Sequence, residues 1–436
     1  MGKSQKLYEK AKRLIPGGTQ LLSKRPEMFL PGLWPAYYEE AKGCTVRDLD
    51  GKRYIDMSHM GVGSCILGYA DKDVNKAVNA TVDAGNMSTL NAPEEIELAE
   101  VLTKIHPWAK MARYARTGGE SMAIAVRIAR AYTGKDIVLF CGYHGWSDWY
   151  LSSNLSDDRS LDGHLLPGLE PKGVPRQLKG TAIPFNYNDT KGFLKLAGQY
   201  KGRIAAVVTE PIRNVYPKKG FLETLRSETR KQKIPLIIDE ITAGWRLCCG
   251  GAHKLFGIEP DLAVFAKAMS NGFPMAAVIG RREVMDIAQE TFISSTYWTD
   301  RIGPVSALAT ITKLRKCHVT EHLETVGKKI QEGWRRLASE HGIRIEISGI
   351  YPLGHFSFKH KEPLALKTLY TQLMLQKGFL ATNAFYASYA HKGEHVDGYL
   401  QAAGEAFRAI AIAIESGKPA KYLKGPVCHS DFKRLA

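Results

Sequence analysis

Residues 265–272 read FAKAMSNG, and this stretch places a lysine where a buried strand is expected to end. The run from Leu262 to Ala266 is entirely apolar, as in strands that are covered on both faces of a parallel sheet. Lys267 follows at once, although a buried ammonium group is costly unless it is paired or loses its charge. One interpretation is a lysine just past the strand with its head in water. The other is a desolvated nucleophile for an aldehyde.

The apolar run belongs to an alternation of strands and helices between about residues 60 and 300. Helical patterns fall between continuous apolar runs, which predicts βαβ units around an open, mainly parallel sheet. Ligands of such sheets bind beyond the carboxyl ends of the strands. We expect strands at 136–140, 204–209, 235–239, 262–266 and 276–280, and helices at 94–104, 120–133, 221–232 and 283–289.

The two ends of the chain have different patterns, which predict a smaller α+β domain. Residues 44–58 are typical of a hairpin, with Asp50-Gly51 as a type I′ turn signal. Residues 151–180 have no clear period, which is typical of a lid, a binding loop or a disordered segment. We expect an N-terminal arm and hairpin at 1–60 that is part of the small domain, a large α/β domain at 61–310, and a C-terminal α+β domain at 311–436.

Composition narrows the class of protein. The 60 basic and 44 acidic residues give a net charge of +16, but no basic run of five appears, so we expect no nucleic-acid partner. A basic surface also suits anionic substrates or cofactors. The seven cysteines and 13 histidines show no metal-ligand spacing, so we expect no metal. No signal peptide or membrane-length apolar run occurs, which predicts a cytoplasmic protein without a membrane partner.

Three further motifs surround Lys267 in the predicted sheet. Asp239 ends the strand in LIIDE, where a carboxylate could bond a protonated pyridine nitrogen. The stretch RTGGES at 116–121 runs into a helix, whose exposed amides suit a phosphate. Tyr143, in GYHGW at 142–146, offers a flat surface for a ring. Taken singly, these motifs are also compatible with a glycine-rich helix cap and a core aromatic residue.

Together and in order, the motifs resemble the class III, fold type I pyridoxal-phosphate aminotransferases. They are Gly118-Gly119-Glu120, Tyr143-His144-Gly145, Glu210-Pro211, Asp239-Glu240 and Lys267. The closest likeness is to the branch around glutamate-1-semialdehyde 2,1-aminomutase, over roughly residues 5–315 and more loosely beyond. The resemblance implies a large, mainly parallel sheet of the seven-stranded type, a smaller α+β domain and the cofactor pyridoxal 5′-phosphate.

The resemblance also implies roles for individual residues. Lys267 matches the lysine that forms a Schiff base with the cofactor and then moves protons, and Asp239 matches the carboxylate that keeps the pyridine nitrogen protonated. Tyr143 matches the aromatic residue that stacks on the ring. Thr296 matches a threonine that reaches the phosphate of the neighbouring subunit, which implies a homodimer with shared active sites. The remaining matches are Thr117, Gly118 and Gly119 at the phosphate and Glu210 near the cofactor edge.

These roles predict an aminotransferase that moves an amino group from a small amino-acid donor, L-glutamate, to a carbonyl acceptor. The chain departs from the aminomutase at residues 19–29, TQLLSKRPEMF, where Lys24 or Arg25 falls only roughly in register with an arginine that grips the substrate carboxylate. Tyr297 and Trp298 add stacking surface that suits a sugar ring. The branch that the chain resembles is often associated with polysaccharide biosynthesis, so the resemblance implies a keto- or aldehydo-sugar acceptor. The alternatives are the aminomutase itself and a non-catalytic binding homologue, against which Lys267 and Asp239 count.

Overall fold

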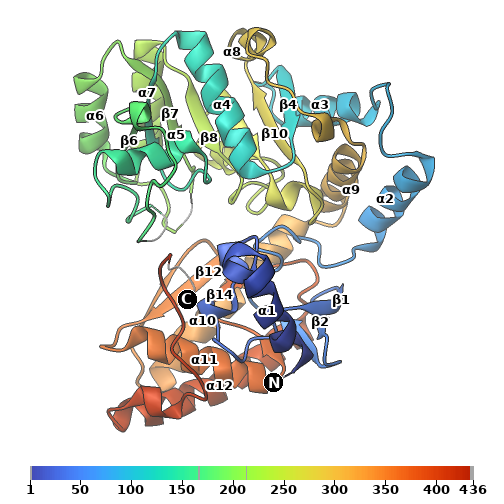
Figure 1. Ribbon diagram of the computed structural model, residues 1–436, viewed down its shortest axis with the longest axis vertical. Helices are drawn as coiled ribbons and strands as arrows, with labels where there is room; N and C mark the ends of the chain where they lie inside the picture. The colour runs from blue at the N-terminus through green and yellow to red at the C-terminus, as the bar shows by residue number, and fades with distance from the viewer. Residues whose placement is uncertain (1, 165–166, 213, 433–436) are drawn as a thin grey trace. The chain divides into compact units, whose positions relative to one another are not determined.

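The computed structural model describes residues 2–164, 167–212 and 214–432, and the chain separates into two compact units. Unit 1 consists of Met1–Asp71 with Glu321–Ala436, and unit 2 consists of Lys72–Thr320 (Figure 1). The boundaries expected from the sequence, after residues 60 and 310, lie slightly earlier in the chain. Each unit is described by itself.

Unit 2 is built on a seven-stranded sheet with the strand order β4-β10-β9-β8-β7-β5-β6. Strand β10 is antiparallel to both of its neighbours, and the other pairs are parallel. The five expected strands are confirmed; β4 and β6 were missed, because the first is only partly buried and the second has three residues. The strands are β4 Met111–Ala115, β5 Ile137–Cys141, β6 Ala182–Pro184, β7 Ile204–Thr209, β8 Leu236–Asp239, β9 Leu262–Phe265 and β10 Ala276–Gly280.

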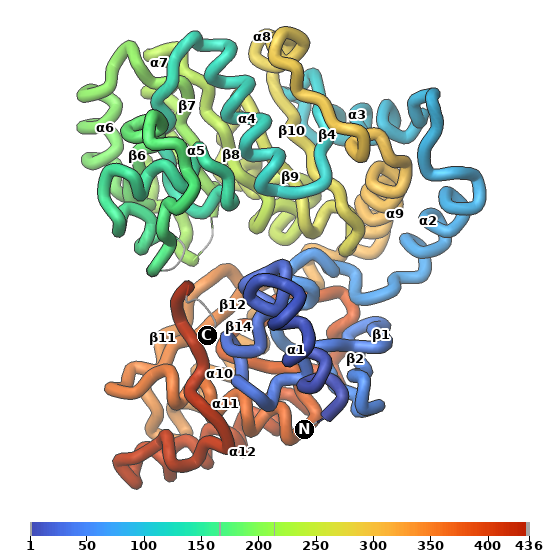
Figure 2. The backbone as a smooth tube through the Cα atoms, viewed as in Figure 1, coloured from blue at the N-terminus to red at the C-terminus, as the bar shows by residue number. Residues whose placement is uncertain are grey.

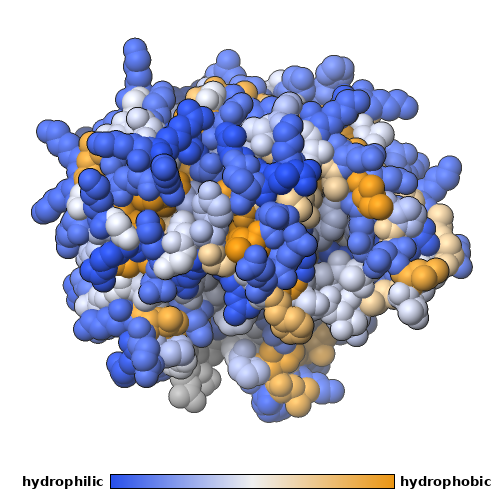
Figure 3. All heavy atoms as spheres, turned by 90° about the horizontal axis from the view of Figure 1, so that it is seen from above, coloured by the Kyte–Doolittle hydropathy of each residue, from blue (hydrophilic) through white to orange (hydrophobic). Residues whose placement is uncertain are grey.

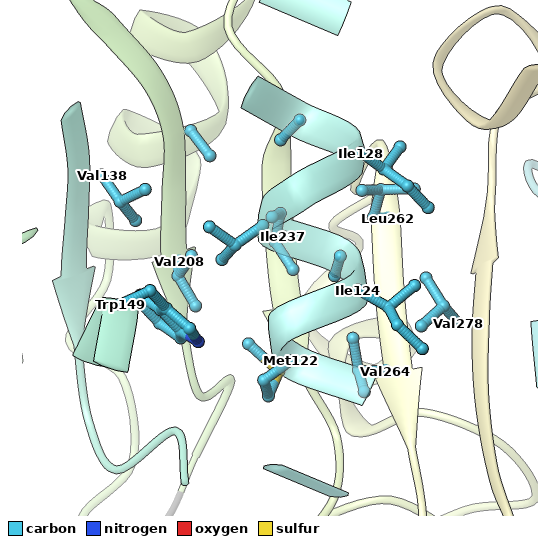
Figure 4. Packing of buried hydrophobic residues seen from close by; sticks show 14 of the residues in the cluster. Met122, Ile124, Ile128, Val138, Trp149, Val208, Ile237, Leu262, Val264 and Val278 are labelled. Atoms are coloured by element: carbon cyan, nitrogen blue, oxygen red, sulfur yellow. The ribbon is translucent and has the colours of Figure 1, made fainter. Parts of the chain in front are cut away.

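Helices cover both faces of this sheet, which explains why its strands are apolar throughout. On one face α4 packs Met122, Ile124 and Ile128 against strand residues such as Leu262 and Val264 (Figure 4). On the other face α6 and α7 bury side chains against the alternate residues of β5, β7 and β8. The helices of unit 2 are α2 Lys72–Ala84, α3 Glu94–Ile105, α4 Gly118–Thr133, α5 Asp148–Leu151, α6 Thr190–Gln199, α7 Phe221–Gln232, α8 Arg282–Met285 and α9 Ile302–Lys316.

Unit 1 combines both ends of the chain, and the blue N-terminal segment lies among the orange and red C-terminal elements (Figure 2). It holds a four-stranded sheet, β1-β2-β3-β13, and a three-stranded sheet, β11-β12-β14. The strands are β1 Tyr38–Lys42, β2 Thr45–Asp48, β3 Arg53–Asp56, β11 Ile345–Ser348, β12 Leu353–Phe358, β13 Phe379–Leu380 and β14 Ala384–Tyr386; the helices are α1 Lys3–Leu14, α10 Val319–Glu340, which begins in unit 2, α11 Pro363–Gln376 and α12 Gly393–Glu415.

The hairpin of β2 and β3 is confirmed, but the expected type I′ turn is wrong. A type I′ turn needs positive φ at both central residues, whereas Gly51 has φ 81° and Asp50 does not have positive φ. The Asp48 side chain instead accepts hydrogen bonds from the backbone of Asp50 (3.0 Å) and Lys52 (2.9 Å). Because this carboxylate satisfies the amides of a longer loop, one left-handed glycine is sufficient.

The face shown in Figure 3 is mainly hydrophilic, with small separate apolar areas. Among the described residues, no helix combines the length and the apolar character that crossing a bilayer requires.

Candidate active site

Five of the predicted site residues lie at the carboxyl ends of five strands of the unit 2 sheet. Thr117 follows β4, Tyr143 follows β5, Glu210 follows β7, Asp239 ends β8 and Lys267 follows β9. All five strands run in the same direction, because β4 and β9 are both antiparallel to β10. The structure therefore places these residues along the edge of the sheet at which ligands of such folds bind.

Lys267 begins a 3₁₀ turn, Lys267–Ser270, directly after the buried strand β9. Its φ is +48°, a left-handed conformation that costs a non-glycine residue about 1–2 kcal/mol. Its half-buried side chain donates from Nζ to Oγ1 of Thr242 at 2.9 Å. The lysine is therefore held inward, and the interpretation of a lysine with its head simply in water does not describe this contact.

Asp239 is buried and forms a close pair with His144, whose side chain is fully buried. Oδ2 of Asp239 lies 2.8 Å from His144 Nδ1, and Oδ1 accepts a hydrogen bond from the Ile241 backbone at 3.0 Å. His144 Nε2 lies 3.0 Å from the carbonyl oxygen of Cys141. Both ring nitrogens of His144 thus face acceptors, so the pair must hold two protons for two hydrogen bonds.

The placement of those protons decides the charge of the pair. Either His144 is an imidazolium beside an ionised Asp239, or a neutral His144 accepts a hydrogen bond from a protonated Asp239. The pair carries no net charge in either case. A carboxylate oxygen can accept more than one hydrogen bond, so an ionised Asp239 keeps acceptor capacity for a proton-bearing ring nitrogen.

The N-terminus of α4 has the features that an anion-binding position requires. Thr117 caps the helix in a capping box with Glu120, whose carboxylate accepts hydrogen bonds from the Thr117 backbone (3.0 Å) and hydroxyl (2.9 Å). The first two helical residues, Gly118 and Gly119, present amides that have no acceptor inside the helix. The macrodipole and these amides favour a phosphate here.

Close packing explains why these two helical residues are glycines. A Cβ on Gly118 would lie 2.8 Å from the Ile241 side chain, and a Cβ on Gly119 would lie 3.3 Å from the Trp146 indole. The phosphate position, the turn after Asp239 and the GYHGW loop are therefore in direct contact within unit 2. The residues present fit a cofactor with a phosphate, an aldehyde and a pyridine nitrogen.

Tyr143 and Glu210 are linked through the backbone of the loop after β5. The Tyr143 amide donates to Glu210 Oε2 at 3.3 Å, and a Cβ on Gly142 would lie only 2.5 Å from the same oxygen. Glu210 is buried. Burial raises the pKa of the Cys141 thiol, and the negative charge of Glu210 raises it further. Glu210 thus fixes the loop that carries Tyr143.

Thr296 stands apart from the other predicted site residues. It starts an exposed 3₁₀ turn, Thr296–Thr299, and within the described chain no hydrogen bond joins its side chain to those residues. Arg116 anchors this turn beside the phosphate position, because its Nη2 donates to the carbonyl oxygens of Trp298 (2.8 Å) and Asp300 (3.0 Å). Arg116 also forms an ion pair with the Asp300 carboxylate.

Sequence reasoning missed three residues of this site. Thr242 and Ile241 follow Asp239 without a pattern of their own, and only the folded turn shows their contacts with Lys267 and Gly118. Arg116 carried a usable signal, since it directly precedes the Thr-Gly-Gly cap, but its partner is 184 residues away.

In its described residues, the segment 151–180 contains short turns and no long element. It includes the 3₁₀ turns Ser152–Leu155 and Arg176–Leu178, and residues 165 and 166 lie outside the described residues. Leu161 and the Asn154 side chain are buried, so this part of the segment packs on the sheet domain. The lid stays a prediction. No group of acidic, histidine or cysteine side chains suited to a metal occurs among the described residues.

Comparison with known proteins agrees with this geometry. Residues 32–384 match the Aminotransferase class-III family. The chain is 32% identical over 399 residues to a 3-aminobutyryl-CoA aminotransferase of Cloacimonas acidaminovorans, covering 90% of this chain and 91% of the relative. It is 32% identical over 435 residues to a glutamate-1-semialdehyde 2,1-aminomutase of Methanocaldococcus jannaschii, covering 94% and 99%. A 2′-deamino-2′-hydroxyneamine transaminase of Streptomyces kanamyceticus is 29% identical over 371 residues, covering 85% and 90%.

Solved structures share the whole fold. The FumI protein of a Sphingopyxis species, in its PLP internal aldimine form, superposes with a TM-score of 0.86 at 25% identity and covers 97% of this chain and all of that one. The chain therefore belongs to the class III aminotransferases, in the glutamate-1-semialdehyde aminomutase-like branch of these fold type I pyridoxal-phosphate enzymes.

Proposed function

We propose that the protein transfers an amino group from L-glutamate to a carbonyl acceptor of the keto- or aldehydo-sugar class. One observation carries the transfer chemistry: Lys267 leaves a buried strand directly beside the strand that ends in the buried Asp239–His144 pair. A nucleophilic amine and a carboxylate that can hold a protonated ring nitrogen are what amino transfer needs from the protein.

Pyridoxal phosphate, when bound, supplies an aldehyde and an electron-accepting ring. Lys267 Nζ would take the α-proton from the amino-acid donor and would later return a proton to the carbonyl acceptor. Asp239 would hold the ring nitrogen, and Tyr143 would stack on the ring from the loop that Glu210 fixes. The amides of Gly118 and Gly119 would hold the phosphate, and Thr117 would support them by capping the helix.

Two observations support a sugar acceptor. Trp146 and Tyr297 are 73% and 71% exposed, and Trp146 lies against Gly119 at the phosphate position. Large exposed aromatic faces are suited to stacking on the apolar face of a sugar ring. The relative from Streptomyces kanamyceticus acts, by its name, on a neamine derivative, which is a carbohydrate-based compound.

The second candidate is the aminomutase reaction within glutamate semialdehyde, which the relatives that carry this name favour. At the departure noted in residues 19–29, Arg25 is buried with its guanidinium against Gly17, since a Cβ there would lie 2.6 Å from Nη2. Lys24 is exposed. Lys24 is a poorer bidentate clamp than an arginine, and Arg25 turns its guanidinium toward Gly17, which favours the aminotransferase. If this gene restored growth to a tetrapyrrole auxotroph, the aminomutase reaction would become the better-supported candidate.

We also propose a cytoplasmic homodimer with shared sites. Thr296 is exposed and, by resemblance, reaches the phosphate of the other subunit. Leu90 and Phe292 are 82% and 91% exposed in the single chain. A partner subunit would cover such large apolar side chains. Analytical ultracentrifugation should give twice the chain mass, and a monomer would contradict the shared site.

The visible spectrum tests the proposed function directly. The purified protein should show a yellow band with pyridoxal phosphate, and L-glutamate should bleach it. Lys267→Ala should abolish the covalent band, with an unchanged far-UV circular dichroism spectrum as the control for folding. A bleached enzyme should recover its colour with keto- or aldehydo-sugars. Recovery with simple keto acids alone would contradict the sugar acceptor, and a band that glutamate leaves unchanged would contradict the donor.

A further inference from the structure

Lys267 has a hydrogen-bond acceptor that the proposed function does not use. Its Nζ lies 2.9 Å from Oγ1 of Thr242, and Thr242 comes three residues after Asp239 in the turn that leaves β8. The ring-nitrogen carboxylate and the partner of the reactive amine therefore belong to one short turn. A displacement of this turn would move both of them together.

Hydrogen bonds from buried residues hold the turn that carries Thr242. Gly244 donates to the Glu240 carbonyl at 2.8 Å, and the Thr242 carbonyl accepts from Arg246 Nε at 2.7 Å. Arg246 is 1% exposed and Glu240 is fully buried. The Glu240 carboxylate in turn accepts from the backbone of Ala252 at 2.9 Å. The hydroxyl of Thr242 is thus presented from a fixed backbone.

The way this hydroxyl is used differs from that of threonines inside the helices of unit 2. The hydroxyls of Thr229 and Thr310 donate to carbonyl oxygens of their own helices, a local bond with no long-range consequence. Thr242 instead accepts a hydrogen bond from a side chain on the neighbouring strand connection. Lys267 in turn has a left-handed backbone, which its surroundings must maintain.

We propose that Thr242 is a positioning residue that holds the Lys267 amine for its attack on the cofactor aldehyde, an inference that rests on the proposed role of Lys267. A hydroxyl suits this task because it fixes the direction of one N–H without adding a negative charge, whereas a carboxylate would stabilise the unreactive ammonium form. In the attack the neutral amine would form a C=N bond with the aldehyde carbon. The aldehyde oxygen would leave as water with both amine hydrogens, so no oxidant or reductant is needed.

The experiment measures capture of pyridoxal phosphate by cofactor-free protein, which requires no substrate. Thr242→Val keeps the branched shape and removes the hydroxyl, and Thr242→Ser keeps the hydroxyl. The rate is followed by the visible band, and borohydride reduction with peptide mass spectrometry confirms attachment at Lys267. Loss of one orienting hydrogen bond should slow capture by Thr242→Val about three- to tenfold, with Thr242→Ser within about twofold of the wild type.

A second readout separates positioning from a general structural role. In single-turnover reactions with L-glutamate, Thr242→Val should lower the limiting rate while the half-saturating glutamate concentration stays within about twofold. Equal or faster capture by Thr242→Val, or an equal loss in Thr242→Ser, would overturn the inference. Wild-type protein that never attaches the cofactor at Lys267 would instead overturn the proposed function, so the two failures are distinguishable.

Discussion

Two carboxylate–histidine pairs lie side by side at the end of β8 and have nearly the same geometry. Asp239 pairs with His144 at 2.8 Å, and the next residue, Glu240, pairs with His253 at 2.7 Å. All four side chains are at least 97% buried. Distance and burial alone would therefore assign them the same role.

The outer nitrogen of each histidine separates the two pairs. His144 Nε2 faces a carbonyl oxygen, whereas His253 Nε2 accepts a hydrogen bond from Trp108 Nε1 at 3.3 Å. His253 is therefore neutral, with its one proton on Nδ1, and Glu240 remains an anion that also binds two backbone amides. The first pair has no net charge and leaves Asp239 suited to the reaction. The Glu240–His253 pair uses its charge to hold the backbone amides of Ala252 and His253.

Replacing Asp239 should have the largest effect, and on activity. Asp239→Ala should lower the rate of the glutamate half-reaction about a thousandfold, because the ring nitrogen loses its stabilising carboxylate. The free energy of unfolding should fall by only about 2–3 kcal/mol, since His144 and the Ile241 amide each lose one hydrogen bond. Single-turnover spectroscopy and urea unfolding measure the two quantities. Asp239→Asn is the shape-matched control and should also be nearly inactive; full activity in either variant would remove Asp239 from the site.

Replacing Glu240 should have the next largest effect, and on stability. Glu240→Ala leaves two backbone amides and His253 without their acceptor, so the free energy of unfolding should fall by about 3–5 kcal/mol. Urea unfolding followed by circular dichroism provides the measurement. Activity per folded molecule should stay within about tenfold of the wild type. A stable but inactive Glu240→Ala would make both pairs part of the chemistry and break the comparison.

The sequence predicts the parts of this fold that repeat. The runs at β5, β7, β8, β9 and β10 are apolar because helices cover both faces, and such runs are visible in the sequence without a structure. β6 is short and β4 is half-buried, so neither produces such a run. In the hairpin, the carboxylate of Asp48 replaces the turn that Asp50-Gly51 suggests. The Asp50-Gly51 signal failed there because the Asp48 side chain satisfies the backbone amides of Asp50 and Lys52.

The sequence predicts only those site residues that lie at the ends of apolar strands. Lys267 and Asp239 are polar residues that end apolar runs, and this contrast is visible in the sequence. Thr242 and Trp108 carry no such contrast, and their partners lie 25 and 145 residues away. Contacts of that kind arise from strand order, which periodicity does not contain.

His106, which lies beside the Glu240–His253 pair, tests the comparison of the two pairs through the pH dependence of stability. His106 stacks on His253, and burial, with the nearby His253 as a smaller cause, lowers the pKa of His106 to about 3. Because the unfolded histidine titrates near 6.5, the unfolded chain binds one more proton between these values, and stability falls as pH falls below about 6.5. Unfolding free energies at pH 5 and 6 should show this slope. In His106→Gln it should decrease by about 1 kcal/mol per pH unit; an unchanged slope would mean that His106 is charged when folded.

The smallest effect should come from replacing Trp108, whose hydrogen bond sets the charge of the Glu240–His253 pair. Trp108→Phe removes the N–H donor to His253 and keeps an aromatic ring beside it. The free energy of unfolding should fall by about 1 kcal/mol, because His253 Nε2 is left without a donor. The rate of the glutamate half-reaction should not change, since the Asp239–His144 pair does not touch this donor. NMR of ¹⁵N-histidine protein would show His253 keeping its neutral Nδ1–H form in the wild type, and an imidazolium there would mean that the two pairs hold the same number of protons.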